Sequence, residues 1–348
     1  MTHQIDMVLD FQYGSTGKGL IAGWLAKRAN YDTAVCAFAT NAGHTYIDKS
    51  RDIHMMTQQL PTAISSPTVK NVMLGPGSLI HLETLNKEID TYVDMLQGKR
   101  IMIHPHAAVV ADYHAREEVE QGMTKMGSTA KGVGAAMIER IRRQPEANVM
   151  KNVNKTHRAS QYVVSIAEYD DTMNAAENIV IEGAQGFSLS IYHGQYPYTT
   201  SRDVTPWQVA ADCGIPFKWA NRIQIIGTLR TYPIRVNNRD GSSGPHYPDQ
   251  QEISFSDIGQ DAEVTTVTKL PRRLFTFSHE QLQDAFYHCG HYWSTKLFLN
   301  FANYMPDEDR LNSLIDRIEH QTERNMNPPK VVWLGNGADD KDVLQRRR

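Results

Sequence analysis

A glycine-rich stretch near the N-terminus carries the clearest chemical signal in the sequence. It reads Gly14-Ser15-Thr16-Gly17-Lys18-Gly19 and lies between an apolar run, 5–11, and an amphipathic stretch, 20–29. Glycines let backbone N–H groups close around a phosphate, a helix N-terminus adds a positive dipole, and Lys18 adds a full charge. The spacing is shorter than in a standard P-loop, and Gly19 stands where a Ser or Thr would hold magnesium. The stretch predicts a phosphate-binding turn; an ordinary strand-to-helix turn is the alternative.

A histidine follows the next apolar run. The segment Asn41-Ala42-Gly43-His44-Thr45 comes after the run 33–38. Loops at the carboxyl ends of neighbouring parallel strands converge on one crevice, so we expect His44 to lie near Lys18. There it could donate a proton or a hydrogen bond to a phosphoryl oxygen. The alternative is an incidental loop histidine.

A third segment has the composition of a ligand-recognising turn. Glu182-Gly183-Ala184-Gln185-Gly186 follows another apolar run and continues to the stretch 193–200, HGQYPYTT. An amide flanked by glycines at a strand end can pair with the edge of a heterocycle, because it both donates and accepts hydrogen bonds. The segment predicts recognition of a base by Gln185, with a plain turn as the alternative.

A fourth group of side chains suits the binding of a carboxylate. Thr265 and Thr266 come shortly before Arg272 and Arg273. Hydroxyl groups donate single hydrogen bonds, and a guanidinium group can hold a carboxylate with two. The segment predicts a site for an acidic small molecule; a solvated basic turn is the alternative for the two arginines.

The elements that must position these residues alternate along the chain. Apolar runs that read as buried strands are 5–11, 33–38, 101–103, 179–181, 223–228, 296–301 and 331–334. Amphipathic stretches that read as helices include 20–29, 82–95 and 311–323. This alternation is typical of an α/β protein with a large, mainly parallel central sheet flanked by helices. The polar segment 237–261 is either a solvated loop or a loop that covers the substrate.

Composition excludes several classes of protein. The chain has 348 residues with 36 Lys and Arg against 39 Asp and Glu, a formal net charge of -3. A protein that binds duplex nucleic acid usually has a clear basic excess, so we expect small-molecule partners and neither nucleic acid nor membrane. The three cysteines, far apart in sequence, predict reduced thiols without a zinc site. The N-terminus does not resemble a signal peptide and no run is long enough to span a membrane, so we expect a cytoplasmic location.

Taken in order, these segments resemble the adenylosuccinate synthetases. That family has a phosphate loop GDEGKGK, then NAGHT, a GTTGRGIGP-like segment, EGAQG with HGTYPYVTS, and an arginine-rich aspartate loop. The counterparts here are 14–20, 41–45, 127–134, 182–186 with 193–200, and 265–273. Each motif alone is weak or moderate, but their shared order is specific and extends from about residue 10 to residue 337. The resemblance implies the P-loop-like fold of that family, as a single domain over 1–348.

The resemblance also implies a two-step reaction and a role for each matching residue. The γ-phosphate of the donor would go to the 6-oxygen of a purine nucleotide, and the amine of L-aspartate would then displace phosphate at carbon 6. Catalysis would involve Ser15, Lys18, His44 and Gln185, with Mg²⁺ bound by Ser15 and Gly43.

The donor would contact Gly14, Ser15, Thr16, Gly17, Lys18, Gly19, Gly43, His44, Thr45, Asn300, Asn303, Gly335, Asn336 and Gly337. The acceptor nucleotide would contact Ser15, Asn41, Ser128, Thr129, Gln185, Leu189, Thr200 and Val236. Aspartate would contact Thr265, Thr266, Arg272 and Arg273. Arg142 or Arg143 would reach the nucleotide phosphate of a neighbouring subunit, which implies a homodimer.

Two positions depart from the family pattern. Ser15 stands where the family has a catalytic aspartate that takes the proton from purine nitrogen 1 and contacts magnesium. A serine hydroxyl is neutral and a poor base, which suggests either lost activity or a purine whose 2-amino group needs the space. Asn303 stands where a family aspartate accepts hydrogen bonds from the guanine of GTP. Because Asn303 also donates hydrogen bonds, adenine becomes acceptable as the donor base.

Both departures are features of a phage-type branch of this family, the 2-aminoadenylosuccinate synthetases. This resemblance implies a carbon–nitrogen ligase that converts dGMP, L-aspartate and ATP or dATP to N6-succino-2-amino-2'-deoxyadenylate in the cytoplasm of a host. One alternative is an orthodox adenylosuccinate synthetase that uses inosinate and GTP. Another is a nucleotide-binding switch that has kept the phosphate turn and lost catalysis.

Overall fold

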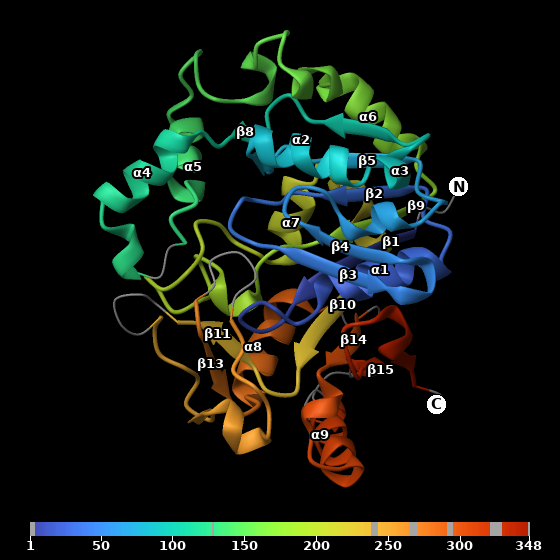
Figure 1. The fold of residues 1–348 in the computed structure, drawn as a ribbon, viewed down its shortest axis with the longest axis vertical. Helices are drawn as coiled ribbons and strands as arrows, with labels where there is room; N and C mark the ends of the chain where they lie inside the picture. Colours follow the sequence, from blue (N-terminus) through green and yellow to red (C-terminus); the bar gives the residue numbers. More distant parts are fainter. Residues whose placement is uncertain are drawn as a thin grey trace.

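A nine-stranded sheet runs through the computed structural model, which describes residues 4–126, 129–237, 243–264, 270–290, 295–320 and 329–346. Its strands are β1 (Gln4–Asp10), β2 (Thr33–Cys36), β5 (Asn71–Leu74), β7 (Arg100–Ile103), β9 (Asn178–Glu182), β10 (Ile223–Arg230), β14 (Thr295–Asn300), β15 (Lys330–Gly335) and β16 (Val343–Gln345). They lie in the order β16-β15-β14-β10-β1-β9-β2-β5-β7 (Figure 1). Neighbouring strands are parallel except β16, which is antiparallel to β15. The predicted large, mainly parallel sheet is confirmed.

Each strand predicted from an apolar run is present, with ends that differ by no more than two residues. The sequence prediction missed β5 and β16, which have only four and three residues. The long predicted helix at 82–95 is two helices, α2 (Leu82–Thr91) and α3 (Val93–Leu96). The interruption lies at Tyr92, whose hydroxyl hydrogen-bonds with both the N–H and the carbonyl of Met56. The prediction at 311–323 corresponds to α9 (Glu308–His320), and 321–323 lie outside the described residues.

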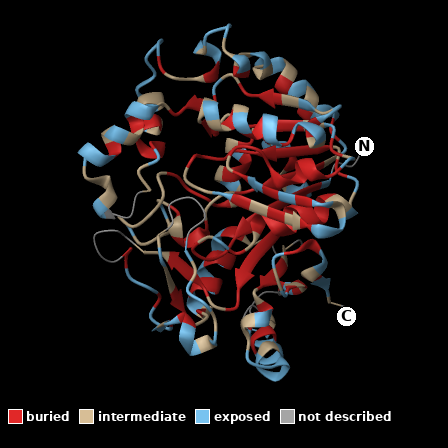
Figure 2. Cartoon of the chain, in the orientation of Figure 1, coloured by how far each residue is buried: buried red, intermediate tan, exposed pale blue. Residues whose placement is uncertain are grey.

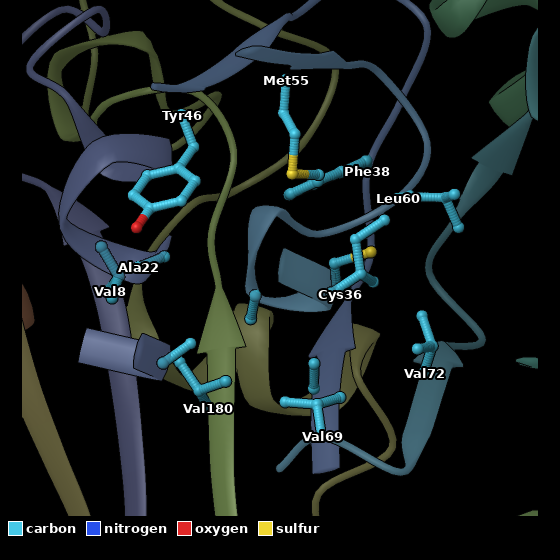
Figure 3. Close-up of a cluster of buried hydrophobic side chains, with 14 of the residues drawn as sticks. Val8, Ala22, Cys36, Phe38, Tyr46, Met55, Leu60, Val69, Val72 and Val180 are labelled. Carbon is cyan, nitrogen blue, oxygen red and sulfur yellow. The ribbon is translucent and has the colours of Figure 1, made fainter. Parts of the chain in front are cut away.

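Helices cover both faces of the sheet. The core on one face contains residues of α1 (Lys18–Arg28) and α2. The core on the other contains residues of α6 (Ile166–Ala175), α7 (Pro206–Asp212), α8 (His279–Cys289) and α9. Side chains alternate along β1, so Val8 joins the first core while Met7 and Leu9 join the second. Figure 3 shows part of the first core, with Val8, Ala22 and Val180 among its side chains, and Figure 2 shows that buried residues follow the sheet.

Smaller elements surround the sheet (Figure 1). They include a hairpin of β3 (His44–Asp48) and β4 (Ile53–Thr57), a pair of β6 (Leu79–Ile80) and β8 (Ala108–Val109), and the helices α4 (Asp112–Glu120) and α5 (Val133–Arg142). A three-stranded sheet contains β11 (Ile234–Val236), β12 (Glu252–Ile253) and β13 (Arg272–Phe275). No helix in the described part of the chain is long and apolar enough to cross a membrane.

The polar segment 237–261 was expected to be a solvated loop or a covering loop. Residues 238–242 lie outside the described part of the chain. The remainder contains β12 and a short 3₁₀ helix, Phe255–Ile258, and the side chains of Tyr247 and Gln250 are buried. The described part is therefore packed into the fold, and it is not a solvated loop throughout.

Candidate functional site

A cavity of about 730 Å³ lies at the edge of the sheet formed by the carboxyl ends of its parallel strands. The turns that follow β1, β2, β9 and β14 all contribute to its walls, as expected for ligand sites of open parallel sheets. Most residues proposed from the sequence line it: Gly14, Ser15, Gly17, Lys18, Gly19, Asn41, Gly43, His44, Thr45, Thr129, Gln185, Leu189, Thr200, Val236, Arg272, Asn300, Asn303 and Gly337. The expected proximity of His44 and Lys18 is confirmed.

The phosphate turn is shaped from below by the carboxylate of Asp10, the last residue of β1. This carboxylate accepts the N–H groups of Gln12 (2.8 Å) and Gly14 (3.2 Å) and the hydroxyl of Thr16. It also lies 3.0 Å from Lys18 Nζ, and both side chains are buried. Because Lys18 belongs to the cavity wall, its ammonium is held between a fixed carboxylate and the space where a phosphate would lie.

The N-terminus of α1 is open toward the cavity. Gly17 is the N-cap residue, with φ 92°, and no side chain of the described residues caps the helix. The first N–H groups of a helix have no partner within the helix and carry positive dipole. A Cβ on Gly17 would lie 2.2 Å from Asn300 Nδ2, so only glycine fits here. The turn therefore offers backbone donors and one ammonium to an anion.

His44 is fixed by a buried carboxylate. Its Nδ1 lies 2.7 Å from Glu182 Oε1, and its ring stacks on Phe38 at a centroid distance of 4.0 Å. The second oxygen of Glu182 accepts the N–H (2.8 Å) and hydroxyl (3.0 Å) of Thr62. With Nδ1–H directed to the carboxylate, Nε2 is the imidazole atom left for a ligand. No role for Glu182 could be predicted from the sequence, because its partner His44 lies 138 residues away in the chain.

Gln185 adopts the left-handed conformation, with φ 64°, and its Nε2 donates to Asn41 Oδ1 at 3.0 Å. The turn that contains it packs directly on the phosphate turn. A Cβ on Gly186 would lie 2.4 Å from Gly14 N and 2.7 Å from Asp10 Oδ1. A group bound by Gln185 would therefore lie next to a group bound by the phosphate turn.

Two of the predicted contact residues, Thr16 and Arg273, do not line the cavity. The hydroxyl of Thr16 is buried beneath the turn, where it contacts Asp10 and Thr228. Arg273 pairs with Glu252 (2.6 Å) and donates to Gly244 O (2.7 Å) instead of lining the cavity. The reason is the alternation of β13, because consecutive strand residues point to opposite faces and Arg272 takes the cavity side.

Four further residues also lie off the cavity wall. Gly335 packs against the Asn300 side chain, and the N–H of Asn336 donates to Asp342 O at 3.0 Å, so Gly337 alone of the predicted Gly335–Gly337 contacts reaches the cavity. Arg142 and Arg143 are exposed at the end of α5. Ser128, Thr265 and Thr266 lie outside the described residues.

Several cavity residues were not predicted. Arg235 is 3% exposed and donates to Gln195 Oε1 (2.9 Å), Tyr198 O (2.7 Å) and Pro245 O (2.8 Å), and burial lowers its pKa to about 10. These bonds join the segment around Thr200 to β11. Glu263, Phe301 and Tyr304 also line the cavity. The one sequence signal for these residues is proximity to predicted contacts. Glu263 lies two residues before Thr265, Arg235 precedes Val236, and Phe301 and Tyr304 lie within or next to the segment from Asn300 to Asn303.

Among the described residues, no group of three or more His, Cys, Asp or Glu side chains could hold a metal ion. Ser15 and Gly43, the metal contacts expected from the sequence, are both exposed on the cavity wall. Mg²⁺ in phosphate-transferring sites is held largely by substrate phosphates and water, with few protein ligands. One hydroxyl and one carbonyl beside a phosphate turn fit an ion of that kind.

Comparison with known proteins agrees with this geometry. The sequence model of the family described as adenylosuccinate synthetase matches residues 7–161 and 144–293. The N6-succino-2-amino-2'-deoxyadenylate synthase of Vibrio phage phiVC8 is 44% identical over 347 residues, which is 98% of each chain. The adenylosuccinate synthetase of Pyrococcus horikoshii is 30% identical and covers 79% of this chain and 77% of its own. The solved succinoaminodeoxyadenylate synthetase of cyanophage S-2L, bound to dGMP and to dATP as an energy donor, has a TM-score of 0.91 and 38% identity, and the match covers 100% of this chain and 97% of that one.

Proposed function

Because the chain belongs to the adenylosuccinate synthetase family, we propose that it is an enzyme that joins L-aspartate to carbon 6 of dGMP. The donor is ATP or dATP, and the products are N6-succino-2-amino-2'-deoxyadenylate, the nucleoside diphosphate and phosphate. The observation that carries the proposal is the single cavity that contains the phosphate turn, Gln185 and Arg272 together. The similarity to phage enzymes named for this product, and to one solved with dGMP and dATP, selects this substrate over inosinate.

The geometry supports transfer of the γ-phosphate to the purine 6-oxygen. Lys18 and the N-terminus of α1 would bind the phosphate chain, and Nε2 of His44 would donate to a phosphoryl oxygen. Gln185 would hold the purine so that its 6-oxygen faces the γ-phosphorus. The amine of aspartate, bound by Arg272, would then attack carbon 6, and phosphate would leave with the former 6-oxygen.

Mg²⁺ would neutralise charge on the transferring phosphates. We propose that the triphosphate supplies most of its ligands and that the Ser15 hydroxyl and the Gly43 carbonyl complete them. Removing divalent cations with a chelator should abolish product formation, and added Mg²⁺ should restore it. Full activity in the chelator would contradict the proposal.

We propose a homodimer on the basis of α5. Arg142 and Arg143 are exposed at its end and outside the cavity of their own chain, and Ile141 beside them is 68% exposed. A second copy would cover this apolar residue and receive one arginine at its nucleotide phosphate. Sedimentation velocity should give the mass of a dimer, and a monomer at micromolar concentration would contradict it.

The same proposal includes one domain over residues 1–348 and a cytoplasmic location in a host cell. A single sheet contains strands from both ends of the chain, which supports one domain. Cys36, Cys213 and Cys289 are buried and free, as is usual for proteins of a reducing compartment.

One experiment separates the candidate reactions. The protein is incubated with Mg²⁺, L-aspartate and each pairing of dGMP or inosinate with ATP, dATP or GTP, and products are followed by mass. We expect the aspartate adduct of dGMP with ATP or dATP. An adduct from inosinate and GTP alone would show an orthodox adenylosuccinate synthetase, and no adduct with retained nucleotide binding would show a nucleotide-binding switch.

A further inference from the structure

The carboxylate of Glu263 contacts residues of both the proposed donor-base site and the proposed aspartate site. Its Oε1 lies 2.6 Å from Arg230 Nη2 and accepts the hydroxyl of Tyr304 at 3.0 Å. Its Oε2 lies 3.2 Å from both Arg230 Nη1 and Arg272 Nη1. Tyr304 belongs to the turn after β14, where the donor base is proposed to bind, and Arg272 belongs to the segment proposed to bind aspartate. One carboxylate therefore contacts both substrate sites.

Arg230 serves as the fixed partner of this carboxylate. Its side chain is fully buried, and its Nε donates to Tyr232 O at 3.1 Å. Its guanidinium carbon lies 3.5 Å from the ring centroid of Phe301, which also belongs to the turn after β14. A buried guanidinium without an anionic partner is strongly unfavourable, so Glu263 is held in place by its pairing with Arg230. Arg230 thereby fixes Glu263 relative to Phe301.

Arg272 is held on one side only. Its Nη1 contacts Glu263, while its Nε is buried and has no hydrogen-bond partner among the described residues. A guanidinium has five N–H donors in a planar fork, so a contact through one nitrogen leaves donors for a carboxylate ligand. The position of Glu263 therefore sets the direction in which Arg272 presents those donors to the cavity.

Glu263 is ionised in this setting. Burial favours its neutral form, but hydrogen bonds and charge from Arg230 and Arg272 outweigh burial and hold its pKa below the ordinary value. The cluster of Arg230, Arg272 and Glu263 thus retains one net positive charge beside the cavity, as an acidic substrate requires.

We infer that Glu263 is a positioning residue that couples binding of the donor nucleotide to binding of aspartate. A base that settles against Phe301 and Tyr304 fixes these side chains, and the Tyr304 hydroxyl and Arg230 fix Glu263 in turn. Glu263 then holds Arg272 in the orientation that receives the aspartate carboxylate. The inference rests on the proposed function for the identity of the ligands, and it adds a link between their sites.

Binding without turnover tests the coupling. Calorimetry gives the affinity of the dGMP-bound protein for L-aspartate, with and without a non-hydrolysable ATP analogue. We expect the analogue to tighten aspartate binding by about fivefold or more, the lower end of ordinary couplings between sites. No tightening in the unmodified protein would overturn the inference. Because no reaction is needed, this result is independent of whether the dGMP adduct forms.

Two variants locate the coupling. Glu263→Gln should weaken aspartate binding and abolish the tightening, while the affinity for dGMP stays within about twofold. Tyr304→Phe removes one hydroxyl at the donor end, and it should reduce the tightening without changing aspartate affinity in the absence of the analogue. If Tyr304→Phe alters ATP affinity alone and leaves the tightening intact, the link through Glu263 does not exist.

Matched controls separate this role from general stability. Glu319→Gln changes another carboxylate that contacts two cations, Lys330 (3.2 Å) and Arg346 (2.9 Å), but Glu319 lies in α9 outside the cavity wall. Tyr113→Phe removes the hydroxyl of an exposed tyrosine in α4, which donates to Glu139 in α5. Both controls should keep the coupling. Its loss in either control would assign the effect to stability and overturn the inference.

Discussion

At the residue scale, the structure separates the groups that face the cavity from those that support them. Ser15 is exposed on the cavity wall, with φ 56°, whereas Asp10 is buried beneath the turn. The carboxylate of Asp10 is directed to Thr16 and Lys18 and does not belong to the cavity wall, so Asp10 shapes the turn instead of contacting the purine. The chain therefore presents the neutral side chain of Ser15 to the cavity, at the position where the resemblance predicted a catalytic aspartate.

Ser15→Asp tests whether this neutral side chain selects the purine. The variant should lower kcat/KM for dGMP by at least about tenfold, because a carboxylate crowds the 2-amino group and adds negative charge beside the phosphates. Ser15→Ala keeps the space for the 2-amino group and removes only the hydroxyl oxygen, so its kcat/KM for dGMP should fall less than that of Ser15→Asp. Steady-state kinetics with dGMP measures both, and unchanged turnover of Ser15→Asp would exclude Ser15 from substrate selection.

Glu182→Gln tests the orientation of His44. Glutamine keeps the size of the side chain and can still accept from Thr62, but its NH2 group then replaces the oxygen that accepts the Nδ1–H of His44, so the ring loses the bond that orients it. We expect kcat to fall roughly 10- to 100-fold with little change in KM, as for weakened proton or hydrogen-bond donation in the transition state. Glu139→Gln is the control, because Glu139 lies 2.7 Å from His114 outside the cavity. An equal loss of kcat in both variants would contradict a special role for Glu182.

At the scale of elements, the phosphate turn is set by strands from opposite ends of the sequence. β1 supplies Asp10 below the turn, and β14 ends at Asn300, whose Nδ2 donates to Thr16 O at 3.2 Å. Asn300 Oδ1 accepts the N–H of Phe301 at 2.9 Å, so the same amide joins the phosphate turn to the proposed donor-base turn. Asn300, which was predicted as one of the donor contacts, therefore in large part supports the backbone of the two turns.

Gly17→Ala tests this arrangement. The variant places a Cβ in a left-handed residue and against Asn300 Nδ2, so the turn must shift. Gly98→Ala is the matched control, because Gly98 has φ +74° with no atom within 4 Å of the added carbon. Each variant should lose about 1–2 kcal/mol of unfolding free energy, measured by denaturant, from the left-handed backbone. Gly17→Ala alone should also lower kcat/KM for ATP roughly 100-fold, because the phosphate donors move. Equal kinetics in the two variants would show that the turn tolerates the shift.

At the scale of the whole molecule, contacts between distant segments close the fold around the cavity. Asp340, near the C-terminus, pairs with Arg28 (2.8 Å) and Lys27 (3.1 Å) of α1 and accepts the hydroxyl of Tyr46 at 2.8 Å. These contacts fix α1, and with it the phosphate turn, against the edge of the molecule that contains β15 and β16. The stability of this whole assembly has a pH dependence that the structure assigns in part to one histidine.

His104 follows β7, and burial lowers its pKa to about 4, with the charges of His106 and Arg140 acting in the same direction. An unfolded histidine titrates near 6.5, so between about pH 4 and 6.5 the unfolded chain binds the extra proton. The contribution of His104 to the free energy of unfolding is therefore largest above pH 6.5, and it decreases as the pH falls toward 4. Denaturant unfolding at several pH values gives the free energy of unfolding. Between pH 6.5 and 4 this free energy should decrease less steeply in His104→Gln than in the unmodified protein. An identical slope in both proteins would contradict the assignment.

The sequence by itself determined the fold class and the location of the site. Apolar runs fixed the predicted strands because burial on both faces of a parallel sheet demands continuous apolar side chains. Glycine-rich turns after those runs identified the phosphate turn, the His44 loop and the Gln185 turn, because backbone conformation and chain direction are local properties. Strand alternation implies only that Arg272 and Arg273 of β13 face opposite sides, and the structure was needed to show that Arg272 is the one on the cavity wall.

Tertiary structure alone decided which polar side chains meet. Glu182 reaches His44, Glu263 reaches Arg230 and Tyr304, and Asn300 supports Thr16, across separations of 138, 33, 41 and 284 residues. None of these pairs has a periodic or spacing signal, because a hydrogen bond depends on the final packing of whole strands and helices. The positions of reacting groups follow from local sequence, whereas the carboxylates and amides that orient them are defined only once the sheet has brought its strand ends together.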